Sequence, residues 1–313
     1  MQAEPFDDIR SLVNRFAGPD RTVSHIAAGS ETGRGGDILR WMAGWSGRAP
    51  QVTRPLVAIF AGTHGIAEAL HPGTAVRTRA AVEAIAAGST ALNRACAAAD
   101  LGLKVFDLAL DIPTADITRA AALDERGCAA TMAFGMEAIA GGTDLLVLGA
   151  SGEGGEIAAA ALIAALLGEA VAADLAELPQ SLSKPIREAL ATHAGVSPDP
   201  LAALASLGGR ETAALAGAIM AARLEKVPVL LDGLSALAAA VVVKALRHDG
   251  VDHCMLGDLG AIGLQRTVAE QLGMDHVVDM GIGAGDGTGG AVAAAALRSL
   301  VATAEPLQRS APH

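Results

Sequence analysis

The chain has 313 residues, which at roughly 150 residues per domain allows one large domain or two unequal ones and excludes a small disulfide-stapled fold. Its 34 acidic residues exceed its 23 basic ones, the formal charge is −11, and aromatic residues make up only 2% of the chain. A protein that binds nucleic acid needs basic clusters for the phosphates and aromatic rings for single-stranded bases, so we expect no nucleic-acid partner.

Apolar residues make up 51% of the chain, but much of this is alanine. Every apolar run is interrupted well short of the about 18 residues that span a membrane, so we expect no membrane association and predict a buried helix for residues 157–167. The acidic residues 1–8 lack the basic and then apolar layout of a secretory signal, which favours a cytoplasmic protein. Cys96, Cys128 and Cys254 are far apart and form no CxxC, which predicts buried thiols rather than a disulfide framework or a metal site.

The first part of the chain differs from the rest. Ile9, Leu12, Val13 and Phe16 give it an amphipathic start, and a stretch containing glycine and arginine follows. We interpret residues 1–50 as a small helical subdomain.

From about residue 55, the sequence alternates short apolar runs, glycine-containing turns and alanine-rich segments. This order is typical of βα units and a parallel sheet. The apolar runs are residues 56–60, 103–110, 145–148, 228–231, 253–256 and 276–280. We therefore predict a Rossmann-like α/β fold with a parallel sheet of about six strands.

The segments between these runs are predicted helices, because alanine has a high helix propensity and lets a helix pack closely on a sheet. They are residues 78–87, 90–101, 128–140, 156–167, 211–224, 235–247, 264–272 and 291–302. Residues 170–210 carry four prolines and little periodicity, and we expect a long excursion that covers a site or reaches a partner subunit.

Ligands of an open parallel sheet gather outside the carboxyl ends of its strands, so the turns after the apolar runs contain the candidate binding residues. The candidates for substrate or phosphate binding in these turns are Gly62, His64, Gly65, Gly149, Ser151, Gly152, Gly154, Asp232, Gly233, Gly285, Gly287, Thr288 and Gly289. Two of the turns are glycine-rich and open helices, where free backbone N–H groups and the helix dipole attract an anion. Glycine also permits close packing and a positive φ, so each loop alone fits either role.

Two titratable residues in these turns have alternative roles. Asp286, flanked by glycines, is our candidate catalytic residue as a proton acceptor, and it would equally cap the following helix. His64 is either a ligand contact or a residue that stabilises its turn. No Walker A loop, nucleophile elbow or HExxH metal motif is present, and the GxGxxG at residues 285–290 is not followed by a further strand and helix.

Taken in order, four segments resemble motifs of the nicotinate-nucleotide:dimethylbenzimidazole phosphoribosyltransferase family. They are residues 60–67 (FAGTHGIA), 208–218 (GGRETAALAGA), 228–233 (PVLLDG) and 285–289 (GDGTG). The resemblance covers residues 55–303, and four motifs in register are much more specific than any one of them.

The resemblance implies a large Rossmann-like domain, here residues 51–302, and a small helical domain built from residues 1–50 and 303–313. It also implies a homodimer that uses no metal or cofactor and acts on small molecules, a mononucleotide and an aromatic base. In the implied reaction, a ring nitrogen of the base displaces nicotinate from C1 of the ribose of nicotinate mononucleotide. The resemblance assigns the phosphate cradle to Gly152, Gly154 and Lys184, and the proton acceptor to Asp286.

The predicted site departs from the family pattern. Asp286 stands where the family has glutamate, and residues 149–157 lack a family glutamate and two threonines. Whether Glu153 or Glu156 takes over the role of that glutamate stays open. We therefore interpret the chain as a divergent member. Three hypotheses stay open: a phosphoribosyltransferase with an altered substrate, a catalytically weak paralogue that binds a nucleotide or base for regulation, and an unrelated sugar-phosphate enzyme on a similar sheet.

Overall fold

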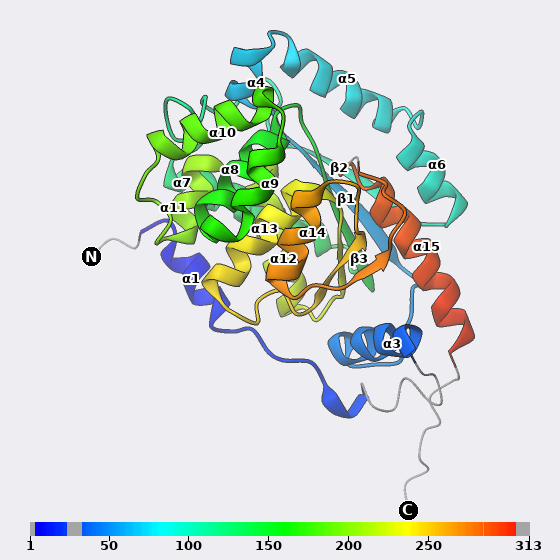
Figure 1. Ribbon diagram of the computed structural model, residues 1–313. Helices are drawn as coiled ribbons and strands as arrows, with labels where there is room; N and C mark the ends of the chain where they lie inside the picture. Colours follow the sequence, from blue (N-terminus) through cyan, green and yellow to red (C-terminus); the bar gives the residue numbers. More distant parts are fainter. Residues whose placement is uncertain (1–3, 24–32, 284, 305–313) are drawn as a thin grey trace, which may run out of the picture.

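A computed structural model of the protein describes residues 4–23, 33–283 and 285–304. Six parallel strands form one sheet in the order β2-β1-β3-β4-β5-β6 (Figure 1). The strands are β1 (Pro55–Ala61), β2 (Gly102–Asp107), β3 (Leu145–Ser151), β4 (Val229–Leu231), β5 (Cys254–Asp258) and β6 (His276–Val278). The predicted α/β class with about six parallel strands is confirmed, and each strand lies within or overlaps one of the six apolar runs.

The runs of the central strands β1 and β3 are continuously apolar because helices cover both faces of the sheet, whereas the edge strand β2 carries Lys104 and Asp107. On β1, Val57 and Ile59 belong to one cluster of buried side chains, whereas Ala58 and Phe60 belong to the other. All four are completely buried.

Two layers of helices enclose the sheet, and Figure 1 shows them on opposite sides. Buried side chains of α3 (Gly33–Ser46), α5 (Thr74–Ala86), α6 (Ala91–Ala98) and α15 (Thr288–Thr303) pack on one face. The other face is covered mainly by α7 (Glu125–Met136), η1 (Glu137–Ile139), α8 (Gly155–Leu167), α12 (Arg210–Leu224), α13 (Gly233–Leu246) and α14 (Gly263–Leu272). The eight predicted helices all correspond to helices of the structure.

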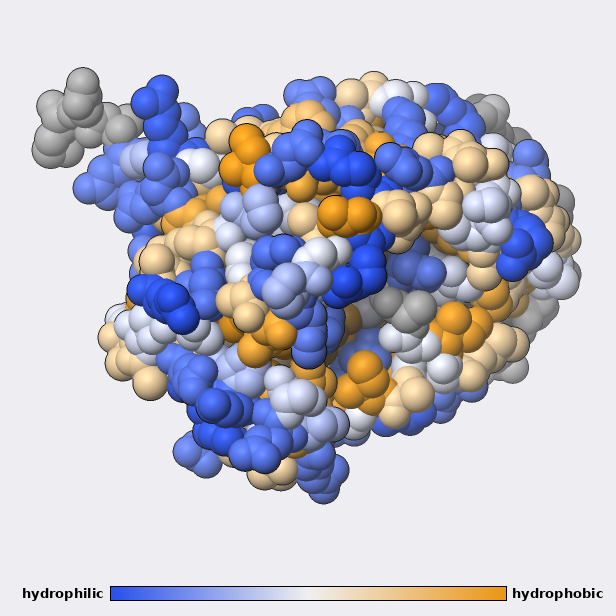
Figure 2. All heavy atoms as spheres, turned by 90° about the horizontal axis from the view of Figure 1, so that it is seen from above, coloured by the Kyte–Doolittle hydropathy of each residue, from blue (hydrophilic) through white to orange (hydrophobic). Residues whose placement is uncertain are grey.

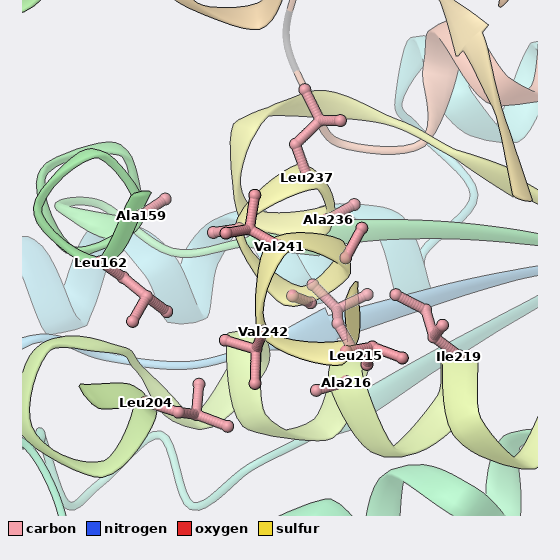
Figure 3. Packing of buried hydrophobic residues seen from close by; sticks show 14 of the residues in the cluster. Ala159, Leu162, Leu204, Leu215, Ala216, Ile219, Ala236, Leu237, Val241 and Val242 are labelled. Carbon is pink, nitrogen blue, oxygen red and sulfur yellow. The ribbon is translucent and has the colours of Figure 1, made fainter. Parts of the chain in front are cut away.

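Small residues let the second layer pack very closely. Where α7 crosses α12, a Cβ on Gly135 would overlap the carbonyl oxygen of Ala214, and a Cβ on Gly217 would overlap that of Met132. Farther out, the side chains of Leu162, Leu204 and Val242 point into one space between three helices (Figure 3). The alanine-rich composition thus serves helix packing, as predicted.

The excursion at residues 170–210 is mostly helical, although its prolines and weak periodicity favoured a loop. Its helices are η2 (Gly168–Val171), α9 (Ala172–Glu177), α10 (Gln180–Thr192) and α11 (Pro200–Leu207). The prolines hid these helices in the sequence, yet Pro179 and Pro200 stand at helix starts, where the missing N–H has no intrahelical partner. A short helix missed by the periodicity, α4 (Gly65–Leu70), follows β1.

The N-terminal helices pack on opposite sides of the sheet. The helix α1 (Asp7–Val13) buries Ile9 and Val13 in the cluster of the second layer, whereas α3 buries Ile38 and Met42 against the strands of the opposite face. The division into a small and a large domain stays a prediction, and residues 305–313 lie outside the described residues.

The most apolar helix is a core helix. By length and composition, residues 155–177 could cross a membrane, but α8 buries every residue from Ile157 to Ala164 within the protein and packs against α10, α11 and α13. This packing is typical of a soluble protein and confirms the predicted buried helix. The three cysteines are buried as predicted, and burial raises the pKa of Cys96 to about 11.

Candidate functional site

The strand order reverses between β1 and β3, because the chain passes from β1 outward to β2 and then returns to the other side of β1. In open α/β sheets, this switch point is where the loops diverge and a ligand binds at the carboxyl ends of the strands. The loops that contain His64 and Gly152 follow these two strands. Their backbones meet, because the amide of Gly62 donates to the carbonyl oxygen of Ser151 at 3.0 Å.

A pocket of about 350 Å³ opens at this edge. Figure 2 views the molecule from this side, where hydrophilic residues gather around a depression. The pocket is lined by Arg77, Thr78, Ala81, Ala150, Ser151, Gly152, Glu153, Gly155, Glu156, Glu211, Leu234, Ser235, Ile262, Gly283, Gly285 and Asp286. The volume of this pocket is in the range of small-molecule sites. A second cavity, of about 650 Å³, lies near Asp144 and Val227, which stand before the amino ends of β3 and β4. The first pocket is the candidate site because it lies at the carboxyl edge.

Asp286 lines the pocket and binds the first residue of α15, whose N-cap residue is Gly287. Its Oδ1 accepts a hydrogen bond from the backbone amide of Thr288 at 2.9 Å, while the side chain is only partly buried. The alternative of an N-cap at Asp286 is therefore wrong by one residue, and the bond to Thr288 uses Oδ1 and leaves Oδ2 as a further acceptor.

Asp232 lies beneath the same loop rather than in the pocket. It is 2% exposed, and its Oδ2 accepts from the amide of Gly287 at 2.7 Å. Burial, with a contribution from the charge of Asp286, raises the pKa of Asp232 to about 7. Amides at the start of α15 thus donate to the protein's own carboxylates, so they do not form an open anion cradle in this structure.

The backbone of this loop approaches the start of α13 closely. Gly233, with φ +82°, opens α13, and a Cβ there would overlap the Cα of Gly285. Glycine at these positions is explained by close packing, which was the second interpretation of the glycine-rich turns.

His64 and Glu211 form a completely buried pair behind the pocket. The His64 Nε2 atom lies 2.8 Å from Oε1 of Glu211, and both side chains are at most 1% exposed. Burial alone lowers the pKa of a histidine, but the adjacent carboxylate more than offsets this and raises the pKa of His64. Burial alone raises the pKa of a glutamate, but His64 reverses this and lowers the pKa of Glu211. Each partner of the pair therefore favours the charged form of the other.

Among the described lining residues, one cation faces four carboxylates. The cation is Arg77 on α5, and its guanidinium is bound by Glu153, with Nε 2.7 Å from Oε1 and a terminal nitrogen 2.7 Å from Oε2. Glu68 holds the start of α5 by accepting from the amides of Gly73 and Ala75, and these hydrogen bonds lower its pKa to about 2. The helix that carries Arg77 is thus anchored beside the pocket.

The structure brings some of the predicted site residues together and leaves others apart. Ser151, Gly152, Gly285 and Asp286 line the pocket. The rest of the turn candidates pack behind or beside it: Gly62, His64, Gly65, Gly149, Gly154, Asp232, Gly233, Gly287, Thr288 and Gly289.

Lys184 is not among the residues that line the pocket. It is on α10, with its side chain 65% exposed and its ammonium 3.9 Å from Glu188. The structure therefore does not bring Lys184 together with the glycine loops. Among the described residues, no group of three or more His, Cys, Asp or Glu side chains is placed to hold a metal ion.

The sequence and the fold were compared with known proteins. The profile of a family described as "Phosphoribosyltransferase" matches residues 29–311. A nicotinate-nucleotide–dimethylbenzimidazole phosphoribosyltransferase of Brucella anthropi is 47% identical over 94% of this chain and 92% of its own length. The enzyme of the same name from Brucella melitensis biotype 2 is 48% identical over 93% of this chain and 91% of its own. The chain belongs to the nicotinate-nucleotide:dimethylbenzimidazole phosphoribosyltransferase family.

The fold agrees with this membership. A crystal structure of a nicotinate-nucleotide–dimethylbenzimidazole phosphoribosyltransferase from Thermus thermophilus superposes with a TM-score of 0.76 at 28% identity, and the match covers 96% of this chain and 95% of that one. The resemblance seen in four sequence motifs is therefore confirmed at the level of the family.

For this phosphoribosyltransferase family member, sequence reasoning missed several pocket residues. Arg77 and Thr78 lie inside a helix with no motif around them, so nothing in the sequence marked them. Glu211 lies within the motif at residues 208–218. Its place in the first turn of α12, directly after two glycines, was the feature that could have marked it as a site residue.

Proposed function

We propose that this chain transfers the phosphoribosyl group of nicotinate mononucleotide to a ring nitrogen of an aromatic base such as dimethylbenzimidazole, in synthesis of the cobamide lower ligand. The observation that carries the proposal is the pocket at the β1/β3 switch point, with Asp286 on its wall, in a chain 47% identical to a curated enzyme of that name. The reaction needs no electron transfer, and the proposal invokes no cofactor.

The chemistry assigns a proton acceptor to the pocket. The free ring nitrogen of the azole attacks C1 of the ribose, the C1–N bond to nicotinate breaks, and nicotinate leaves with the bonding electron pair. The attached azole then carries a positive charge until its N–H proton is lost. In our proposal Asp286 takes this proton.

The mainly negative charge of the pocket lining supports a second candidate function. Arg77 is occupied by Glu153, and no other described lining residue is cationic, so an anionic mononucleotide meets mainly carboxylates. A catalytically weak paralogue that binds a base or nucleotide as a regulatory protein would have the same pocket without needing fast transfer.

A turnover assay separates the two functions. The purified chain is incubated with nicotinate mononucleotide and a panel of benzimidazoles, purines and phenols, nicotinate release is followed by chromatography, and thermal shift is recorded on the same samples. We expect release that falls by about 10²–10⁴-fold in Asp286→Asn, the usual contribution of a general base. Asp279→Asn is the control, because Asp279 pairs with Arg266 outside the pocket lining. A thermal shift without release would contradict the enzyme and support the binding protein.

We also propose that the chain is a cytoplasmic homodimer. Large apolar side chains are exposed near the edge strand β2: Val76 on α5 is 69% exposed, Ile112 is 61% exposed, and Phe134, which packs edge-on against Phe106, is 44% exposed. Light scattering after size exclusion should give twice the mass of the chain, and Val76→Asp should reduce it. A wild-type monomer would contradict the dimer, and recovery in a membrane or secreted fraction would contradict the location.

A further inference from the structure

The buried pair of His64 and Glu211 joins three loops at the carboxyl edge of the sheet. His64 follows β1, Glu211 lies in the first turn of α12, and the two side chains meet at 2.8 Å. Their own loops close around them, since a Cβ on Gly62 or on Gly209 would lie 2.5 Å from an oxygen of Glu211. The backbone therefore packs directly against the pair, and the pair sets how far apart these loops lie.

The third loop, which follows β3, is the one that reaches the pocket. A Cβ on Gly155 would lie 3.4 Å from Oε1 of Glu211 and 3.6 Å from Nε2 of His64. A Cβ on Gly152 would lie 3.7 Å from the His64 ring. Both glycines line the pocket, whereas His64 does not. His64 thus stands behind this wall of the pocket and acts on a ligand only through the position of the wall.

The contribution of the pair to stability does not explain its presence. Apart from the contact between them, the side-chain nitrogen and oxygen atoms of His64 and Glu211 have no hydrogen-bond partner among the described residues. Removing two such groups from water can cost more than one contact returns, and apolar side chains of similar volume often replace a buried pair without loss of stability. An apolar pair lacks direction, however, whereas a donor and an acceptor fix the angle and distance between their groups.

The same wall is connected to the loop of the proposed proton acceptor. The amide of Ala150, near the end of β3, donates to the carbonyl oxygen of Gly285 at 3.0 Å, and Asp286 is the next residue. Ala150, Gly285 and Asp286 all line the pocket. A shift of the loop after β3 therefore changes the distance between a bound substrate and Asp286.

We propose that His64 is a positioning residue, which holds the wall at Gly152 and Gly155 in place by donating from Nε2 to Glu211. The inference rests on the proposed function for the reaction that the wall serves. A displacement of about 1 Å can lower a rate by roughly 100-fold. Loss of the donor should therefore lower kcat more than it raises KM, because the pocket and its charged groups remain.

Two substitutions of His64 test the donor. Glutamine carries its amide nitrogen about as far from the backbone as Nε2, whereas the asparagine amide is one carbon shorter. His64→Asn should lower kcat by about 10–100-fold with KM within about threefold, and His64→Gln should keep kcat within about threefold of the wild type. His193→Asn is the matched control, because Nε2 of His193 contacts the carbonyl oxygen of Ile117 at 2.9 Å outside the pocket lining. Its kcat should change by less than about twofold.

An apolar replacement separates positioning from stability. The double variant His64→Leu/Glu211→Met should keep the urea midpoint of the wild type or raise it, because no buried charge remains. Its kcat should nevertheless be as low as that of His64→Asn. If His64→Asn does not fold, the double variant supplies the comparison with His64→Gln.

Several results would overturn the assignment. These are a double variant with the kcat of the wild type, a double variant that is clearly less stable than the wild type, equal losses in His64→Gln and His64→Asn, or a loss that lies wholly in KM. A wild type that releases no nicotinate contradicts the proposed function, and amide hydrogen exchange of residues 152–158 then decides this inference. Exchange there should be faster in His64→Asn than in the wild type and His64→Gln, and equal exchange in all three proteins would overturn the inference.

Discussion

The buried carboxylate of Asp232 holds the amide of Gly287 at 2.7 Å, one residue beyond Asp286. Asp258 holds the other end of the same loop, accepting from the amides of Met280 and Ile282 at 2.6 Å each. Two buried carboxylates thus fix the loop that carries the proposed proton acceptor. Positioning of this kind matters, because about 1 Å of displacement can lower a rate by roughly 100-fold.

Asp232→Asn should change how stability depends on pH. Burial raises the pKa of Asp232 to about 7 in the folded protein, whereas an unfolded aspartate titrates near pH 4. Between these values the folded state keeps a proton that the unfolded state has lost. The wild-type free energy of unfolding should therefore decrease as pH rises through this window, with a contribution of about 1.4 kcal/mol per pH unit. Asp232→Asn should remove that contribution.

Urea denaturation of both proteins between pH 5 and 8 measures this effect. The difference in slope is the readout, because the amide also changes the hydrogen bond to Gly287 and so shifts stability at every pH. Above about pH 7 the two curves should run parallel. Identical slopes from pH 5 to 7 would contradict a protonated Asp232 in the folded protein.

The strands were predictable because a parallel sheet covered on both faces needs side chains that are apolar at every position. This holds for residues 145–148, which are completely buried in β3 and stand out from the alanine-rich helices around them. Residues 170–210 were not predictable by the same logic. A proline such as Pro185 inside α10 usually argues against a helix, yet here it lies in the second turn, and tertiary packing of Ile186 and Ala189 outweighs the local preference.

The site was predictable only where its residues directly follow strands. Ser151 and Asp286 were predicted because they lie in glycine-rich turns after strands, where ligands of a parallel sheet bind, and both line the pocket. Arg77 and Glu211 come from helices far apart in the sequence and meet only in the folded chain. The assignment of Lys184 depended on motif order alone, which does not determine which way a residue on the outer helix α10 faces.

Arg77 should bind an anionic group of the substrate once it is released from Glu153. Their two-pronged ion pair lies in the lining and is about half exposed, so it can open at low cost. Glu153→Gln should free the guanidinium and lower KM for nicotinate mononucleotide by about 3–10-fold. Arg77→Gln should raise KM by about 10-fold or more, equivalent to about 1.4 kcal/mol of binding. Steady-state kinetics with the nucleotide varied measures both changes.

Arg79→Gln is the matched control for Arg77. It removes a cation from the same helix, but Arg79 pairs with Asp111 and does not line the pocket, so KM should change by less than about twofold. Equal effects of the two arginine variants would indicate general electrostatic attraction instead of contact. An increase in KM in Glu153→Gln would mean that the ion pair holds α5 in place and does not compete with the substrate.

Arg223 on α12 packs against Trp45 of the N-terminal helix α3, and we expect this packing to contribute more to stability than the charge of Arg223 does. Its side chain is fully buried, with the guanidinium 4.1 Å from the ring centroid of Trp45 and 3.2 Å from the Asp249 carboxylate. Asp249 keeps a second partner, Arg247 at 2.6 Å, and is itself 38% exposed, so losing Arg223 does not leave a buried anion unpaired. A buried ion that is replaced by an apolar side chain of similar volume is often neutral for stability, whereas a cavity is not.

We therefore expect a contrast between two substitutions of Arg223. Arg223→Met keeps most of the volume against Trp45 and should change the free energy of unfolding by less than about 1 kcal/mol. Arg223→Ala leaves a cavity and should lower it by about 3 kcal/mol. Urea denaturation at pH 7 with a shared m-value measures both. If methionine destabilised the protein as much as alanine, the charge of Arg223, acting on Asp249 and the Trp45 ring, would be the main source of its contribution, and packing would be secondary.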